Sequence, residues 1–235
     1  TSAPDSALGS AGDWNIDGTL KLTVADGKTL TKGQAYTITF SLENPSSTLT
    51  SPTVNVAATL KNAGATVGSV TQDAMSTPGG TLYGVANGDD PLTVVVPTFS
   101  TKSIEQNNPF ADQTNTLTVT LQSDTHTAPA GTIVTITGLA GSDTATKSDL
   151  AVTSSPDSAL GSAGEWNIDG TLKLTVASAK VLTKGQAYTI TFSLVNPSSA
   201  LTSPTVNVSA TLKDTGTAVG SVTQDAMSTP GGTLY

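Results

Sequence analysis

The chain contains the run Tyr36-Thr-Ile-Thr-Phe-Ser-Leu42, in which apolar and hydroxyl-bearing side chains alternate at every step. Successive side chains of a strand point to opposite faces, so the alternation predicts one face in a core and one in water. The following Asn44-Pro45-Ser46-Ser47 predicts a turn that ends the strand. The same period-two pattern recurs at 20–24, 54–60, 117–121, 133–139 and 172–176.

A long internal repeat surrounds this run. Pro4 to Tyr83 reappears at Pro156 to Tyr235 with a shift of 152 residues, and eleven of the eighty aligned positions differ. The chain therefore holds one full period and about half of the next. Such near-identity indicates a recent duplication inside a longer array, in which we expect neither end of this chain to be natural.

Composition supports strands over helices. Ser and Thr make up 69 of the 235 residues, β-branched residues are abundant, and helix formers are scarce. Thr and Val pack well on a pleated surface but crowd a helical turn, so the fold class is predicted to be all-β. A domain of roughly 120 residues would bury about two-thirds of its unfolded surface, which is enough to fold alone.

The order of the strands predicts tandem immunoglobulin-like β-sandwich domains. On this interpretation 1–61 is the C-terminal half of one repeat, 62–90 is an interdomain segment, 91–213 is a complete domain, and 214–235 begins the next interdomain segment. The alternative is two small domains per period, cut near residues 90 and 153, each with a thin core. The seven strands expected in the complete domain are Leu92–Phe99, Asn115–Gln122, Thr132–Leu139, Asp149–Thr153, Gly170–Ala177, Gln186–Val195 and Pro204–Leu212.

The interdomain segment is unusually long for a free linker. Within it, Val67 to Tyr83 is the longest run that is identical in both copies. We hypothesise that this segment is ordered and packs on a neighbouring domain or chain. The alternative is that a recent duplication left the run unchanged by chance.

The charge of the chain excludes several partners. A net charge of −8 repels phosphate backbones and anionic membranes, so no nucleic acid partner is expected. No apolar run approaches the roughly 18 residues that span a bilayer, so no membrane insertion is expected in this segment. Low charge, abundant Ser and Thr, Pro-bounded turns and long-range repetition together predict an extracellular or cell-surface location.

Four runs of the sequence form a recognisable set. The runs are Asn115-Thr-Leu-Thr-Val-Thr-Leu121, Ala130-Gly-Thr-Ile-Val-Thr-Ile-Thr-Gly-Leu139, Trp166 to Gly170-Thr-Leu-Lys-Leu-Thr-Val176, and Tyr188-Thr-Ile-Thr-Phe-Ser-Leu-Val-Asn-Pro197. They are similar to repeats of giant secreted surface proteins of unicellular algae and other protists and, more loosely, to the sandwich repeats of bacterial adhesins. The resemblance implies a component of an extracellular coat, fibre or flagellar hair, and it brings no catalytic residues.

Residues suited to catalysis are few, and the chain is predicted not to be an enzyme. The only histidine, His126, falls in the polar loop 123–130 and is expected to be solvated. A serine triad needs a held imidazole, and zinc usually needs several His or Cys ligands. Asp89 and Asp90 are adjacent, but no apolar cleft is expected around them to separate their pKa values.

Calcium is the one ion that the sequence suggests, and no other cofactor is expected. Asp89 and Asp90 lie beside the proposed domain junction, and Asp13 and Asp17 flank Trp14. Oxygen ligands at such joints can stiffen an array. The alternative is that these side chains cap turns, as acidic residues in turns usually do.

The sequence suggests two kinds of contact with sugars, covalent glycosylation and stacking on tryptophan. The sequon Asn207-Val208-Ser209 is a candidate for N-glycosylation, whereas its counterpart Asn55-Val56-Ala57 cannot be modified. Outward rows of Thr suit O-linked sugars, although they also suit ice or plain solvent exposure. Trp14 and Trp166 can stack on a sugar or plug one end of a sandwich, and the plug is the favoured interpretation.

Two functions remain open at this stage. In the first, the chain is a structural repeat of a large extracellular fibre, filament or coat, which assembles through contacts between copies of itself. In the second, it is an adhesin stalk or a module that binds glycans or receptors through its loops.

Overall fold

The computed structural model describes residues 2–229, and every regular element in that range is a strand, which confirms the predicted all-β class. Residues 230–235, part of the segment 214–235, lie outside the described residues. The strands are β1 (Ser2–Ala3), β2 (Asp13–Trp14), β3 (Leu20–Lys21), β4 (Thr37–Ile38), β5 (Asn55–Asn62), β6 (Ala65–Ala74), β7 (Thr101–Gln106), β8 (Thr114–Gln122), β9 (Ile133–Thr137), β10 (Lys147–Ser155), β11 (Ala163–Asn167), β12 (Thr171–Thr175), β13 (Tyr188–Val195), β14 (Asn207–Asp214) and β15 (Thr217–Ala226).

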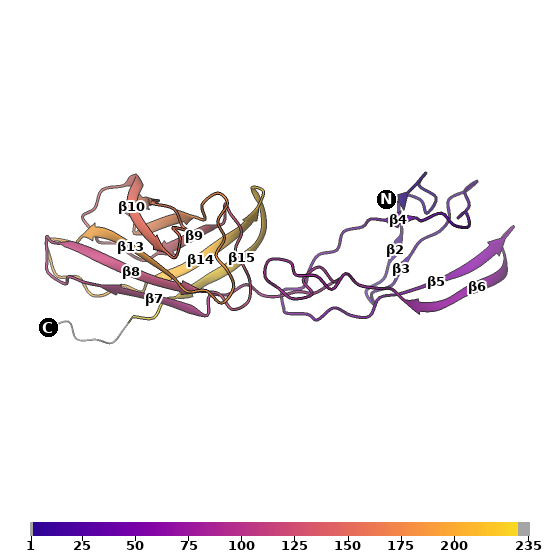
Figure 1. Ribbon diagram of the computed structural model, residues 1–235, viewed down its shortest axis with the longest axis horizontal. Coiled ribbons are helices and arrows are strands. Elements are labelled where there is room, and N and C mark those ends of the chain that lie inside the picture. The colour runs from indigo at the N-terminus through magenta and orange to yellow at the C-terminus, as the bar shows by residue number, and fades with distance from the viewer. Residues whose placement is uncertain (1, 230–235) are drawn as a thin grey trace. The chain divides into compact units, whose positions relative to one another are not determined.

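The chain divides into two compact units, residues 1–44 and residues 45–235. The first unit holds two small two-stranded sheets, β1 with β4 and β2 with β3. The second unit holds the hairpin β5–β6 and a nine-stranded sheet. In that sheet the strand order is β15-β14-β9-β12-β11-β10-β13-β8-β7, and Figure 1 shows these strands enclosing a common interior.

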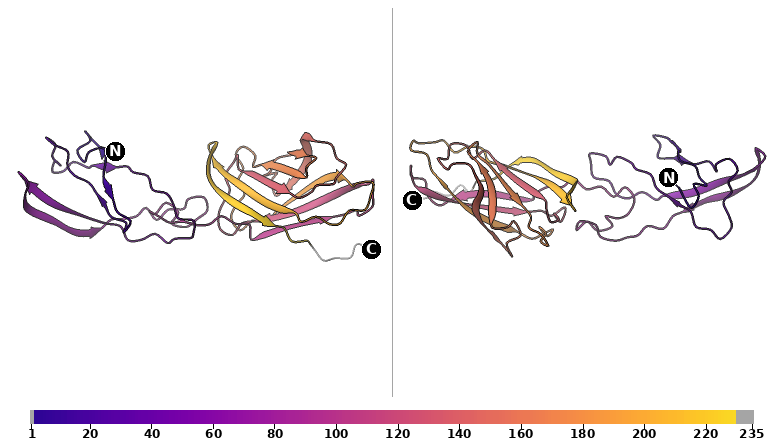
Figure 2. Two further views of the ribbon diagram at one scale, coloured as in Figure 1. Left: turned by 180° about the vertical axis from the view of Figure 1, so that it is seen from behind. Right: turned by 90° about the horizontal axis from the view of Figure 1, so that it is seen from above.

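The nine-stranded sheet is nearly closed on itself, like a barrel. β10 turns the corner, because its residues 152–155 pair with β13 while its residues 147–151 pair with β11 across an irregular register. At the other end Ser228, just beyond β15, forms a parallel bridge to Ser103 in β7. Figure 2 shows the same curvature from behind and from above.

The core of the second unit lies inside this sheet and extends from Phe99 to Met227. Alternate residues of β8, β9, β12, β13 and β14 point inward, as the period-two pattern predicts. Trp166 is completely enclosed, and its Nε1 donates a hydrogen bond to the Thr144 carbonyl (3.0 Å). The favoured interpretation of Trp166 as a buried plug is therefore confirmed.

The first strand of the complete domain lies elsewhere than expected. The apolar run 92–99 was predicted to be a strand, but it is irregular, and only Val94 forms an isolated bridge, to Leu49. The edge strand is the more polar β7, in which Ile104 alone is buried. Pro97 has no N–H to offer a ladder, and an edge strand needs an apolar side chain on one face only, so hydropathy misplaced the strand.

The interdomain segments 62–90 and 214–235 also begin later than expected. The turn at Ala63 and Gly64, both with positive φ, folds β6 back on β5, and β15 pairs with β14 in the same way. β15 thus lies in the nine-stranded sheet, and Val222 and Met227 belong to the core. Few residues of β15 face the core, which left no clear alternation to reveal the strand.

The two copies of the repeat form the same local pairings. Ser2 lies opposite Ile38 as Ser154 lies opposite Ile190. β2–β3 matches β11–β12, and β5–β6 matches β14–β15 including both register shifts. Burial nevertheless differs, because most apolar residues of 154–227 lie in the core, with exceptions such as Ile168 and Val219, while most of their counterparts in 2–75 are exposed.

This difference predicts unequal effects of the same substitution in the two copies. In a Trp14→Phe background Trp166 is the only tryptophan, so its fluorescence reports urea unfolding of the complete domain. Ile190→Ala removes a fully buried side chain and should lower the free energy of unfolding by about 2–5 kcal/mol. Ile38→Ala, the matched control at an exposed position, should leave that transition unchanged. Equal losses for the two variants would contradict the assignment of the core.

Candidate functional site

The predicted calcium ligands are used locally by the backbone. Asp89 accepts a hydrogen bond from the Gly80 N–H (2.6 Å) and Asp90 accepts one from the Gly79 N–H (2.7 Å). Asp17, in the other unit, accepts one from the Thr19 N–H (2.9 Å), and Asp13 lies in β2. In residues 2–229 no three His, Cys, Asp or Glu side chains gather as a metal site would require. The turn-capping interpretation accounts for three of these carboxylates.

The glycosylation candidate Asn207 is half-buried at the start of β14. It lies between the buried residues Val206 and Val208, which places its side chain on the outer face of the strand. Its strand partners are Thr137 in β9 and Ala226 in β15. Modification at this position stays a prediction.

The structure corrects the expected environment of His126. The imidazole is buried rather than solvated, and its Nδ1 forms hydrogen bonds with Ser123 Oγ (2.8 Å) and Thr125 Oγ1 (3.0 Å). Nε2 is buried and has no hydrogen-bond partner among the described residues. Burial lowers the pKa of His126, so the neutral ring is favoured. The polar loop sequence carries no pattern that reveals this, because the alternating burial of His126 and Ala128 is evident only from the fold.

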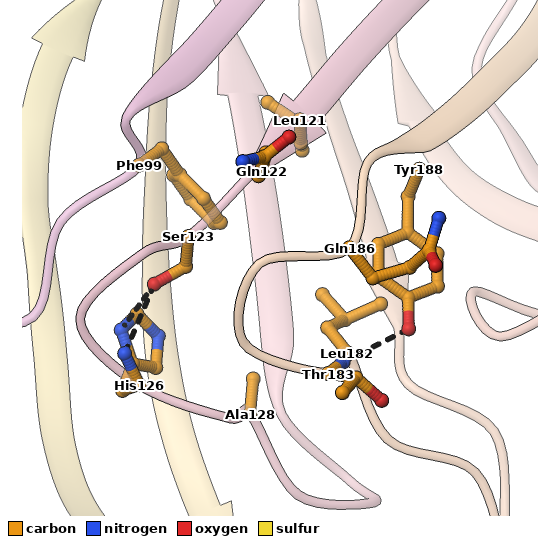
Figure 3. Close-up of a pocket in the computed structure, with 10 residues that line it drawn as sticks. All are labelled: Phe99, Leu121, Gln122, Ser123, His126, Ala128, Leu182, Thr183, Gln186 and Tyr188. Carbon is orange, nitrogen blue, oxygen red and sulfur yellow. Dashed lines mark hydrogen bonds between the residues drawn. The ribbon is translucent and has the colours of Figure 1, made fainter. Parts of the chain in front are cut away.

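Figure 3 shows the hollow beside this ring, where Phe99 and Ser123 lie on one side and Leu182 and Tyr188 on the other. The cavity volume is about 10 Å³, the lower limit for one water molecule. A space of this size has no room for an organic ligand. The imidazole therefore acts as a packing group that closes one end of the core.

The loop that carries His126 also contacts the C-terminal part of the interdomain segment 62–90. Thr127 donates its backbone N–H to the Tyr83 carbonyl (2.7 Å), and the Tyr83 hydroxyl donates to Asp214 Oδ2 (2.9 Å). Gly84 follows with a positive φ, and a Cβ there would meet both the side chain and the backbone of Thr127. We call Tyr83, Gly84, Thr127 and Asp214 the connector joint.

The electrostatics of the joint follow from the hydrogen bond between the Tyr83 hydroxyl and the Asp214 carboxylate. The hydrogen bond to Asp214 raises the pKa of Tyr83, with smaller contributions from burial and from the negative charge of Asp214. The hydroxyl therefore stays protonated and remains a donor. These contacts support the hypothesis that the end of the segment 62–90 packs on a neighbouring domain.

Comparisons with known proteins yield little. No protein family matches the sequence, and neither does any curated protein. Among solved structures, a protein described as AvmM, which catalyzes macrocyclization in alchivemycin A biosynthesis, is 13% identical over 57% of this chain and 92% of its own, with a TM-score of 0.30. A family GH18 chitinase from Chromobacterium violaceum is 16% identical over 59% of this chain and 20% of its own, with a TM-score of 0.25. Similarities this weak carry no argument about function.

None of the described residues belongs to a helix long and apolar enough to cross a membrane.

The buried imidazole predicts a pH dependence. Its folded-state pKa lies below the unfolded value of about 6.5, so the unfolded chain takes up the proton first and stability falls as the pH drops below about 6.5. The melting temperature of the complete domain should therefore decrease between pH 8 and pH 5. His126→Gln, which cannot titrate, should flatten this dependence. Parallel pH profiles for the two proteins would show that other groups cause it.

The connector joint predicts a local change in dynamics. Tyr83→Phe removes the hydroxyl that donates to Asp214, a bond that contributes about 1 kcal/mol. Amide hydrogen exchange of residues 79–90 should speed up by roughly threefold to tenfold, while exchange within β8 and β13 stays slow. Tyr36→Phe is the matched control, because within residues 2–229 the Tyr36 hydroxyl bonds to Thr29 and Thr31 alone, both in the other unit. Unchanged exchange in Tyr83→Phe would show that the joint does not hold the connection.

Proposed function

We propose that this chain is a structural repeat of a large extracellular fibre, filament or cell-surface coat, built of tandem immunoglobulin-like β-sandwich domains that assemble through homotypic contacts. The observation that carries the proposal is that both copies form the same strand pairings in the same register. A sequence repeat that encodes the same strand pairings would present the same surface in every repeat that is complete. One weak contact between such surfaces is then multiplied by every repeat.

A tyrosine at the start of β13 supports the immunoglobulin-like assignment. The Tyr188 hydroxyl donates to the Val181 carbonyl (3.1 Å), seven residues upstream, and accepts from the Thr183 N–H (2.8 Å). A tyrosine that bonds back to the upstream backbone in this way resembles the tyrosine corner of immunoglobulin domains. Tyr36 makes the same two contacts, with Thr29 and Thr31, in the first copy.

The connector joint supports a structural role over a flexible tether. A free linker would let successive domains reorient, whereas Tyr83 and Gly84 tie the connection to the loop at Thr127. The turn before it is held by Asp89 and Asp90, which accept the N–H groups of Gly80 and Gly79. The bonds of Asp89 and Asp90 order the turn within the segment, and Tyr83 and Gly84 tie its end to the loop at Thr127, which suits an ordered connection more than a flexible one.

The surroundings of the side chains that could take part in catalysis or ligand binding support a non-enzymatic role. His126 is enclosed, and the hollow beside it has no room for an organic ligand. Trp14 is exposed, as a sugar-stacking platform would be, but its counterpart Trp166 is a buried plug whose flanking sequence differs nearby only in Glu165 for Asp13. Trp14 is exposed because it lies in a two-stranded sheet, whereas Trp166 lies in the nine-stranded sheet. This exposure therefore does not favour the adhesin or glycan-binding alternative.

Negative-stain electron microscopy tests the proposal. Native material, or the purified chain at high concentration, should form ordered filaments or sheets with a regular repeat. Isolated rods without lateral order would contradict homotypic assembly and favour an adhesin stalk.

A further inference from the structure

His126 shares a short stretch of chain with the connector joint. The next residue, Thr127, donates its backbone N–H to the Tyr83 carbonyl (2.7 Å), and its side chain lies close to Gly84. His126 and Ala128 are buried whereas Thr127 is half-buried, so the imidazole and the Thr127 side chain point to opposite faces of this stretch. One face therefore holds the ring in the core, and the other face holds the end of the interdomain segment.

The imidazole is bonded through one of its two nitrogens. Nδ1 bonds with Ser123 Oγ and Thr125 Oγ1, whereas the buried Nε2 has no partner among the described residues. The side chain is 2% exposed, and the ring of Phe99 lies 6.5 Å from it, centroid to centroid. A neutral ring leaves a single polar atom unpaired in this place. A protonated ring would instead leave an N–H that carries positive charge buried without an acceptor, which costs far more.

The groups around the ring do not balance a positive charge. Among the described residues that line the hollow in Figure 3 there is no Asp or Glu, and the one titratable side chain besides the imidazole is Tyr188, whose hydroxyl bonds with two backbone groups. Asp124, on the same loop as the ring, is exposed and bonds with the Gln122 side chain (2.8 Å). Lys184, on the segment that faces the loop, is exposed and positive, so it repels a charged imidazole.

We propose that His126 is a pH-sensitive switch for the connector joint, in which the neutral ring keeps residues 123–127 closed on Tyr83 and Gly84, and protonation opens them. A buried charge without a partner is strongly unfavourable, so the protonated ring moves into water. Because the ring lies on the core side of its stretch, it reaches water only when the backbone of residues 125–127 turns with it. That turn withdraws the Thr127 N–H from the Tyr83 carbonyl and releases the connection.

The direction of the response follows from the burial of the ring. Burial lowers the pKa of His126 while the loop is closed, whereas in the open loop the ring has its ordinary value of about 6.5. The open loop therefore binds the proton more tightly. The closed joint is favoured at neutral pH and loses stability as the pH falls below about 6.5. The inference concerns one joint and does not rest on filament assembly.

The opening involves the loop and not the sheet. The pairing of β8 with β13 ends at Leu121 opposite Tyr188, before the loop begins, and the bridge between Ala128 and Leu182 closes the loop at its other end. Residues 123–127 lie between these two points and belong to no strand. They can therefore move while both neighbouring pairings stay intact, as expected of a segment with low local stability.

NMR titration of the full chain between pH 8 and pH 5 tests the switch. We expect the amide signals of residues 83–85 to shift with the same midpoint as the ring protons of His126, while the amides of β9 and β12 stay constant. In His126→Gln the signals of residues 83–85 should not shift, and at pH 5 the Thr127 amide should exchange about tenfold more slowly than in the unmodified chain. Different midpoints for the ring and for residues 83–85 would overturn the proposal, as would a change in β9 and β12 at the same midpoint.

Two further variants keep the imidazole and test its coupling to the joint. Asp214→Asn retains an acceptor for the Tyr83 hydroxyl but cannot titrate, so the response of residues 83–85 should persist. Its loss would assign the response to Asp214 and overturn the proposal. Tyr83→Phe weakens the closed joint, and because coupling is reciprocal, the pKa of His126 should rise by about half a pH unit. An unchanged pKa of His126 in Tyr83→Phe would show that the ring and the joint are independent.

Discussion

The alternating apolar side chains of this repeat are buried only where strands β8 and β9 are present. β8 lies along the whole of β13, and β9 fills the gap between β12 and β14, so these two strands join pieces that are distant in the sequence. Burying one Val, Leu, Ile or Phe side chain contributes about 1.5–3 kcal/mol. Because net stability is a small difference between burial and the conformational entropy lost on folding, the fold depends on burying the side chains of β13 and β14. Hairpins such as β5–β6 form without these strands, but they do not acquire a core.

Closure of the sheet depends on a second, smaller set of contacts. β7 is an edge strand on one side, and Ser228 meets it in parallel through the backbone of Lys102 and Ile104. Lys102 also forms a salt bridge with Asp225 (3.0 Å), and the hydrogen bond from Lys102 lowers the pKa of this carboxyl. Because Asp225 is exposed, the pair contributes little energy, but it marks where the two ends of the sheet meet. The contacts occupy the middle of an edge strand that would otherwise be free to pair with other chains.

The sequence was sufficient where alternation was strong. The runs 117–121, 172–176 and 188–194 became strands with the expected inward residues, and the all-β class followed from them. Alternation failed at β7 and β15, because an edge strand needs few apolar residues, and at 92–99, where Pro97 interrupts an apolar run. The connector joint left no pattern at all, since Tyr83 and Asp214 are 131 positions apart and become neighbours only through the fold. His126 was misjudged because a polar loop can still be enclosed when its hydroxyl groups bond to the ring.

The differences between the two copies show how such a repeat can vary without loss of its fold. Nine of the eleven differing positions are exposed in the complete domain, and the other two, Ser209 and Asp214, are half-buried. Asp214 is the acceptor of the Tyr83 hydroxyl, and Asn62, its counterpart, also carries a side-chain oxygen that can accept a hydrogen bond. Substitution at Ser209 decides whether the sequon at Asn207 exists. The buried rows fix the pairing of strands, so the surface of each copy is free to carry a different charge or modification on the same backbone.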